Sequence, residues 1–148
     1  MEIRASRLIQ APIERVFDIF SDITRIEERI SGITKVDILS ETTTGVGTRW
    51  RETRVMFGQE ATEEMEISAF RPAQSYEVLA ASRGSEYHTI YTFIEQNGGT
   101  QVEMIFSGKA VSFMAKLMSP LAALMSGAAR KALETDIEEL QAICEQEN

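Results

Sequence analysis

The residue pattern that points most clearly to chemistry is a polar set on one strand-like run. Trp50, Glu52 and Arg54 occupy alternate positions, so they share one face if the run is a strand. Buried charges are costly unless they are paired, and this leaves two interpretations open. Glu52 and Arg54 pair with each other or with other partners near the rim of a sheet, or they anchor the polar head group of a ligand in an apolar pocket.

Neighbouring runs place more polar residues on the same predicted face, namely Tyr76, Tyr87, Thr89 and Tyr91. A tyrosine phenol beside a bound ligand would donate a hydrogen bond or act as an acid or base. The polar set is therefore a candidate for ligand recognition and, as an alternative, for catalysis.

Other kinds of site lack the residues that they need. The chain has one histidine, His88, and one cysteine, Cys144, so a zinc site is not expected. His88 falls on the strand face opposite Tyr87, where we expect it to be exposed. Cys144 has Ile143 and Glu145 as its neighbours in sequence, neither of them basic, and is expected to be a small buried residue. The predicted solvated face of one strand holds four acidic residues: Glu60, Glu63, Glu64 and Glu66. We predict neither a metal nor a cofactor.

Length, charge and hydropathy narrow the class of protein. The chain has 148 residues, 43% of them hydrophobic, which fits a single domain over residues 1–148 with a core of its own. Its formal net charge of −8 disfavours nucleic acid as a partner. No signal peptide and no transmembrane segment of about 20 apolar residues is visible, so the cytoplasm is the expected location.

The first forty residues predict a strand and two short helices. Glu2 to Ile9 alternates as a strand does, and Pro12 is well placed at the first position of a helix. The apolar stripe of that helix is Ile13, Val16, Phe17 and Phe20. In the second helix Thr24 and Glu27 have the spacing of a capping box, and Gly32 is a natural terminator.

Six strand-like runs between residues 34 and 110 predict an antiparallel meander, because the turns between them are too short for parallel crossovers. One face is apolar and must be covered. Strict alternation assigns to it Val36, Ile38, Trp50, Met65, Ile67, Ala69, Tyr76, Val78, Ala80, Tyr87, Tyr91, Phe93, Val102, Met104 and Phe106.

The predicted cover is a helical segment from about Phe113 to Gln146. Its apolar stripe includes Phe113, Leu117, Leu121, Leu124, Ala128, Ile137, Leu140 and Cys144. Pro120 should kink or restart the helix, and the methionines at 114, 118 and 125 would give residues 112–127 an adaptable apolar surface. We interpret this segment as a movable wall of a cavity; a plain interhelical corner and a homodimer patch remain alternatives.

The whole pattern resembles a known superfamily. It comprises the order of elements together with A-P-I-E-R-V-F-D-I-F-S-D at 11–22, G-V-G-T-R-W at 45–50, R-P at 71–72 and G-G-T-Q-V-E at 98–103. These features resemble the START/birch-pollen-allergen (SRPBCC) superfamily, and within it the bacterial polyketide cyclase/dehydrase-like proteins. The resemblance implies an α+β helix-grip fold: a seven-stranded curved antiparallel sheet wrapped on a long C-terminal helix, with two short helices between strands 1 and 2.

The resemblance also implies a deep cavity that takes lipids, quinones, polyketides or similar apolar molecules, and it supplies no universal catalytic residue. We therefore predict a carrier or sensor of a small apolar molecule; a cyclase- or dehydratase-like enzyme and a protein-interaction module with a vestigial cavity are the alternatives. The predicted cavity lining is Trp50, Glu52, Arg54, Met65, Ile67, Tyr76, Val78, Tyr87, Thr89, Tyr91, Met104, Phe106, Met114, Leu117, Met118, Leu121 and Met125.

Overall fold

The computed structural model describes residues 1–56, 58–82, 84–112 and 126–146. A strand comes first, three short helical elements follow it, then six strands and a C-terminal helix. The elements are β1 (Glu2–Ile9), α1 (Ile13–Ser21), the 3-10 helix η1 (Ile23–Arg25), α2 (Ile26–Arg29), β2 (Ile33–Ile38), β3 (Arg49–Met56), β4 (Gln59–Arg71), β5 (Ser75–Ser82), β6 (Ser85–Gln96), β7 (Gly99–Ala110) and α5 (Ser126–Cys144).

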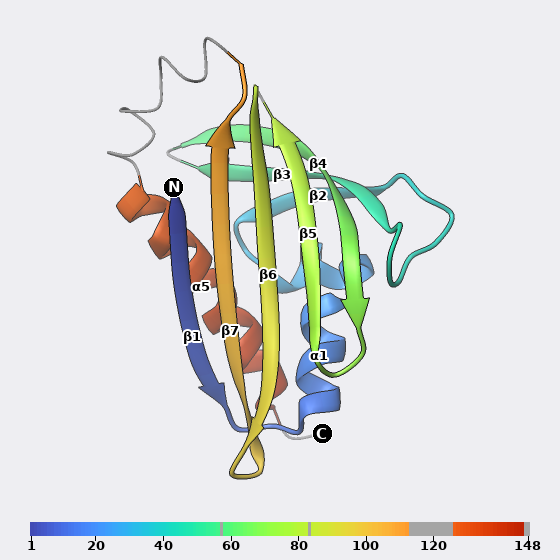
Figure 1. Ribbon diagram of the computed structural model, residues 1–148, viewed down its shortest axis with the longest axis vertical. Helices are drawn as coiled ribbons and strands as arrows, with labels where there is room; N and C mark the ends of the chain where they lie inside the picture. Colours follow the sequence, from blue (N-terminus) through green and yellow to red (C-terminus); the bar gives the residue numbers. More distant parts are fainter. Residues whose placement is uncertain (57, 83, 113–125, 147–148) are drawn as a thin grey trace.

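The strands form one antiparallel sheet in the order β1-β7-β6-β5-β4-β3-β2. Strands that follow one another from β2 to β7 are direct neighbours, and β1 joins the far edge beside β7. Figure 1 shows the sheet curving around α1 and α5, which lie on the same side of it. The predicted seven-stranded helix-grip architecture is therefore confirmed.

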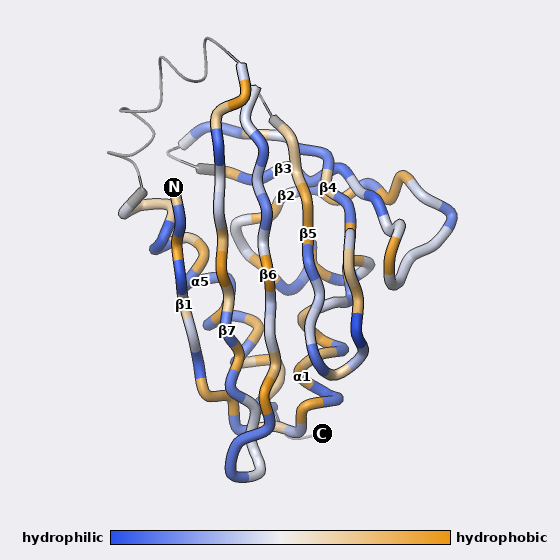
Figure 2. The backbone as a smooth tube through the Cα atoms, in the orientation of Figure 1, coloured by the Kyte–Doolittle hydropathy of each residue, from blue (hydrophilic) through white to orange (hydrophobic). Residues whose placement is uncertain are grey.

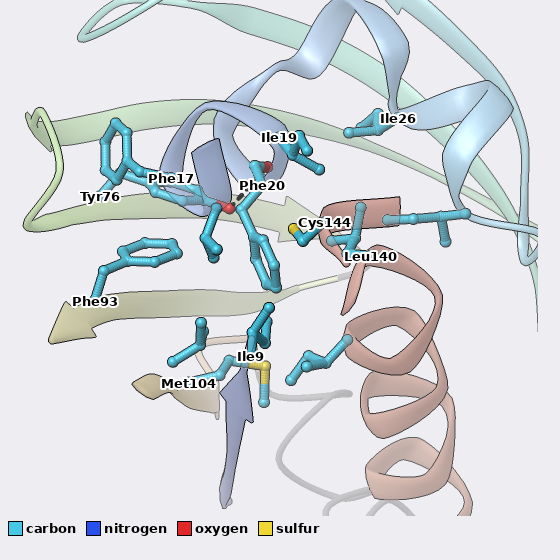
Figure 3. Packing of buried hydrophobic residues seen from close by; sticks show 14 of the residues in the cluster. Ile9, Phe17, Ile19, Phe20, Ile26, Tyr76, Phe93, Met104, Leu140 and Cys144 are labelled. Atoms are coloured by element: carbon cyan, nitrogen blue, oxygen red, sulfur yellow. Dashed lines mark hydrogen bonds between the residues drawn. The ribbon is translucent and has the colours of Figure 1, made fainter. Parts of the chain in front are cut away.

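The core lies between the sheet and the two helices. Three residues of the predicted stripe of α1, Val16, Phe17 and Phe20, are buried, and Ile13 is partly buried against them. Phe17 packs edge-on against Phe70, Tyr76 and Phe93, with ring centroids 5.2, 5.9 and 5.1 Å away. Edge-to-face pairs of this kind add to the stability gained from burial alone. Figure 3 shows Phe20 lying between the rings of Phe17, Tyr76 and Phe93 and the residues Leu140 and Cys144 of α5.

The pattern of burial along the strands follows alternation with local exceptions. In Figure 2 hydrophobic and hydrophilic stretches alternate along β1 and β7, as expected for strands with one buried face. A bulge shifts the register of β4 and β5 between Ile67 and Ala69. Because the bulge breaks the period of two, Phe70 rather than Ala69 packs against the core. Ile38, predicted to face inward, ends the edge strand β2 and is 37% exposed.

The predicted caps of the first two helices are wrong in detail. The Asp22 side chain accepts a hydrogen bond from the Thr24 backbone N–H at 3.1 Å and so caps η1 itself, because an Asp bonds readily two residues ahead of its own position. Glu27 instead accepts from the backbone N–H of Val36 at 2.7 Å. Pro12 is the residue before α1 rather than its first residue.

Helix α5 supplies the predicted cover over the part of it that the structure describes. Ile137, Leu140 and Cys144 are buried as predicted. The N-terminal end of the stripe was misplaced by one residue: Ala128 is exposed, and Ala129 and Leu133 pack against the core in its place. Residues 113–125 lie outside the described part of the chain. They include most of the predicted movable segment, residues 112–127, and Pro120. Within the described part of the chain no helix is long and apolar enough to cross a membrane.

Candidate ligand cavity

A cavity of about 360 Å³ lies between the sheet, the short helices and α5. Three parts of the fold form its apolar walls. The segment from α1 to β2 contributes isoleucines, α5 contributes apolar residues of its buried stripe, and β3 to β7 contribute inward-facing residues. The residues outside the predicted set that line it are Met1, Phe20, Ile23, Ile26, Ile30, Ile33, Ala61, Glu63, Ala129, Ala132, Leu133, Asp136 and Leu140. The mainly apolar walls with a few polar groups are typical of small-molecule sites.

Ten of the predicted lining residues surround this cavity: Trp50, Glu52, Arg54, Met65, Tyr76, Val78, Tyr87, Thr89, Tyr91 and Phe106. Strand parity brings them together, because alternate residues of adjacent antiparallel strands point to one face. Ile67 and Met104 do not line it; they are 0% and 1% exposed and fill the packed core. The other five, Met114, Leu117, Met118, Leu121 and Met125, lie outside the described residues.

Charged side chains gather on one wall of the cavity. Arg54 donates from Nη1 and Nη2 to the two carboxylate oxygens of Asp136, at 3.1 and 2.8 Å. Its Nε lies 3.7 Å from Oε2 of Glu52, whose Oε1 accepts a hydrogen bond from the Trp50 indole at 3.3 Å. The side chains of Arg54, Glu52 and Asp136 are only 18%, 7% and 10% exposed. The first of the two interpretations therefore describes Arg54: it pairs with Glu52 and with a second carboxylate on α5.

The electrostatics of this wall follow from burial. Burial raises the pKa of Glu52, and the charge of Arg54 and the indole hydrogen bond offset only part of that effect. Burial also raises the pKa of Asp136 against the opposing hydrogen bonds from Arg54. Burial lowers the pKa of Arg54, but Asp136 and Glu52 together raise it more. The guanidinium is therefore charged, and the two carboxyls take up a proton more readily than they would in water.

One acidic residue of β4 was assigned to the wrong face. Glu63 was expected on the solvated face with its acidic neighbours, yet it lines the cavity directly opposite Glu52 in the β3–β4 register. The reason is parity, because Ala61, Glu63 and Met65 are alternate residues and all three line the cavity. Glu64 instead pairs with Arg51 on the outer face, at 2.9 Å.

Two stacked tyrosines that line the cavity differ in their hydrogen bonds. Tyr76 and Tyr91 stack with ring centroids 4.9 Å apart. The Tyr76 hydroxyl donates to the backbone carbonyl of Phe20 at 3.0 Å and is therefore structural. Within the described residues the Tyr91 hydroxyl has no hydrogen-bond partner, and no buried side-chain oxygen there is left unsatisfied, so this hydroxyl reaches accessible space. Burial, followed by the charge of Asp136, raises the pKa of Tyr91, which is thus a neutral phenol.

The remaining candidates lie away from the cavity. His88 does not line it, and its Nε2 lies 2.6 Å from Oε1 of Glu77. Its side chain is 38% exposed, so it is half-buried, whereas we expected it to be exposed. Cys144 is buried, and burial raises the pKa of its thiol to about 11. Among the residues that the structure describes, no three metal-binding side chains converge.

Asp136 is the residue of the charged wall that sequence reasoning missed. Its only signal is an acidic side chain within the apolar stripe formed by Leu133, Ile137 and Leu140. A charge in such a stripe indicates a buried partner, but the partner, Arg54, lies 82 residues away in sequence.

Comparisons with known proteins agree with this geometry. A family model described as "Polyketide cyclase / dehydrase and lipid transport" matches residues 1–145. A Thermus thermophilus protein has 19% identity and a TM-score of 0.80, covering 96% of this chain and 95% of its own. The Streptomyces aromatase/cyclase Zhui has 12% identity and a TM-score of 0.74, covering 98% and 93%. The protein Ara h 8.0201 has 14% identity and a TM-score of 0.63, covering 95% and 97%. No curated protein sequence matches at a significant level.

Proposed function

This chain belongs to the polyketide cyclase/dehydrase and lipid transport family of the SRPBCC superfamily, and on that basis we propose that it binds a small, largely apolar molecule between its sheet and α5. The resemblance seen in the sequence is thereby confirmed at the level of family and fold. The molecule itself and any reaction on it belong to the proposal.

The observation that carries the proposal is the cavity itself. A volume of about 360 Å³ is at the lower end of the range found for small-molecule sites. Protein interiors are otherwise close-packed, with few voids larger than a water molecule. An interaction module with a vestigial cavity would have filled this space with side chains, so the open interior favours a ligand binder over that alternative.

Two measurements test the proposal. Native mass spectrometry of the purified protein should show an additional mass from a co-purified apolar compound. Titration with the neutral fluorescent probe N-phenylnaphthylamine should give saturable binding and alter the emission of Trp50, which lines the cavity and is 2% exposed.

A matched pair of variants locates the bound probe. Leu133→Phe adds bulk to the cavity wall, whereas Leu79→Phe makes the same change on a residue that is 43% exposed. We expect Leu133→Phe to weaken probe binding by about tenfold, about 1.4 kcal/mol, and Leu79→Phe to leave it unchanged. Equal affinities for both variants and the unaltered protein would show that the probe binds elsewhere.

A second function is favoured by one observation, the buried carboxyl of Glu52 on the same wall as the neutral Tyr91 phenol. Titratable groups with raised pKa values in a cavity are candidates for acid–base catalysis. Under this alternative Glu52 or Tyr91 moves a proton to or from a polyketide-like substrate. Turnover of such a substrate that is lost in Glu52→Gln, with its binding retained, would distinguish the enzyme from the carrier.

A further inference from the structure

The charges on the wall formed by Glu52, Arg54 and Asp136 are unequal in number. Two carboxylates, those of Glu52 and Asp136, share one guanidinium, that of Arg54. The N-terminal amine of Met1 is exposed and donates to the carbonyl of Gly108 at 3.1 Å. A ligand that approaches this wall therefore meets more negative than positive charge.

The guanidinium is also occupied. Two of its nitrogens donate to Asp136, and the third faces Glu52 at 3.7 Å. Gly32 closes one more side, since a Cβ at that position would lie 3.2 Å from Nη1 of Arg54. A carboxylate ligand would have to compete with two protein carboxylates for Arg54. The second interpretation of the sequence, in which Arg54 helps to anchor a ligand head group, is therefore disfavoured for an anionic head group.

The Tyr91 hydroxyl is an available group beside these charges. It lies close enough to Asp136, Arg54 and Glu52 for their charges to act on it, and it has no protein partner among the described residues. As a phenol it donates one hydrogen bond and accepts others. A ligand hydroxyl or amine could donate one hydrogen bond to a carboxylate of the wall and form a second one with the Tyr91 hydroxyl.

We propose that the cavity selects apolar molecules whose polar group is a neutral or cationic hydrogen-bond donor, a hydroxyl or an amine, and discriminates against carboxylates. This inference rests on the proposed function, because it assigns chemistry to the ligand of the same cavity. Its physical basis is that a buried anion beside two carboxylates that share one guanidinium is strongly disfavoured, whereas a donor to a buried carboxylate makes a charge-assisted hydrogen bond.

A series with one chain length tests it. Decanol, decylamine and decanoate are each used at neutral pH to displace N-phenylnaphthylamine from the protein, with decane as the reference without a polar group. We expect decanol or decylamine to bind at least about tenfold more tightly than decanoate. Decanoate that binds as tightly as the other two would overturn the inference.

Variants connect the selectivity to the wall. Asp136→Asn frees Arg54 of one carboxylate, and we expect it to raise the affinity for decanoate relative to decanol by at least about fivefold. Glu52→Gln removes the other carboxylate, and we expect it also to raise the affinity for decanoate relative to decanol. It replaces Asp136→Asn as the test if that variant does not fold. Glu64→Gln removes the same charge from the exposed pair with Arg51 and should leave the ratio unchanged. A shift equal to that of Glu64→Gln would refute the assignment to this wall.

The outcomes separate this inference from the function on which it rests. If neither the probe nor any member of the series binds, the proposed function fails. If the probe and decane bind but the polar head groups bring no difference, a ligand occupies the cavity and the inference about its polar group is wrong.

Discussion

Replacing Arg54 by methionine should lower the free energy of unfolding far more than the same replacement of an exposed arginine. Methionine approximates the length of the arginine stem but removes the charge. The change leaves Glu52 and Asp136, which are 7% and 10% exposed, without the cation that they share. Breaking a buried pair by removing one partner costs about 3–5 kcal/mol, because the remaining charge stays desolvated.

The matched control is Arg51→Met, the same substitution three residues earlier on β3. Arg51 pairs with Glu64 at 2.9 Å, but the two side chains are 46% and 54% exposed. An exposed pair contributes about 0–1 kcal/mol. The two variants therefore differ in burial while the distance to a carboxylate is similar, 2.9 Å against 2.8 Å for Arg54 and Asp136.

The cost of Arg54→Met should depend on pH in a defined direction. Burial already raises the pKa of Glu52 and of Asp136 in the folded protein, and loss of Arg54 removes the main effect that opposes this rise. A carboxyl whose folded-state pKa is raised contributes stability that is fully present below its unfolded pKa, about 4. That contribution is lost as pH rises through the folded-state pKa. The cost is thus largest at neutral pH and shrinks toward pH of about 4.

Urea denaturation followed by circular dichroism, at neutral and mildly acidic pH, measures the free energy of unfolding of both variants. The double variant Arg54→Met with Asp136→Leu should recover part of the loss at neutral pH, because it also removes one of the two uncompensated charges. A cost for Arg54→Met of about 1 kcal/mol or less, equal to that of Arg51→Met and independent of pH, would show that Arg54 is not the buried cation that Glu52 and Asp136 depend on.

Three further predictions concern single side chains. Tyr76→Phe should lower the free energy of unfolding by about 1–3 kcal/mol, because it leaves the buried carbonyl of Phe20 without its donor. Tyr91→Phe should leave stability nearly unchanged but weaken decanol binding about fivefold. The reverse pattern in denaturation and displacement assays would contradict a structural role for the Tyr76 hydroxyl and a ligand-binding role for that of Tyr91. Glu52→Gln should gain stability relative to the unaltered protein as pH rises above about 4.5, since the raised pKa of Glu52 makes its ionisation costly in the folded state; denaturation series that stay parallel across pH would disprove it. Cys144, with a thiol pKa of about 11, should react with iodoacetamide at mildly alkaline pH much more slowly in the folded protein than in urea, and equal rates by mass spectrometry would contradict its burial.

The architecture was predictable from the sequence because its signals are local and periodic. The alternation around Trp50 and Tyr91 and the stripe of Phe17 and Phe20 each assign a buried face without knowledge of the rest of the chain. Because one parity rule applies to every strand of the sheet, ten of the twelve predicted lining residues that lie on strands surround one cavity. The bulge near Ser68 cannot be recognised from the alternation, since the extra residue is of no type that marks it as a bulge.

The partners across the cavity were not predictable. The bond from Arg54 to Asp136 depends on where α5 crosses the sheet, and that placement is set by packing between distant elements rather than by spacing. Ile67 and Met104 share the predicted face but lie in the packed core, because parity determines the face of a residue and not its depth. The isoleucines of the short helices were missed as lining residues because helical periodicity, like strand parity, assigns a residue to a face and does not say whether that face lines a cavity.

Isotope-filtered nuclear Overhauser measurements on a complex of the labelled protein with unlabelled decanol would locate an apolar molecule in the space between the sheet and α5. We expect contacts from the decanol chain to Trp50, Val78 and Leu133, which line the cavity from the sheet and from α5. Contacts confined to Leu79 and Ile94, which are 43% and 47% exposed, or the absence of any contact at saturating decanol, would contradict this expectation.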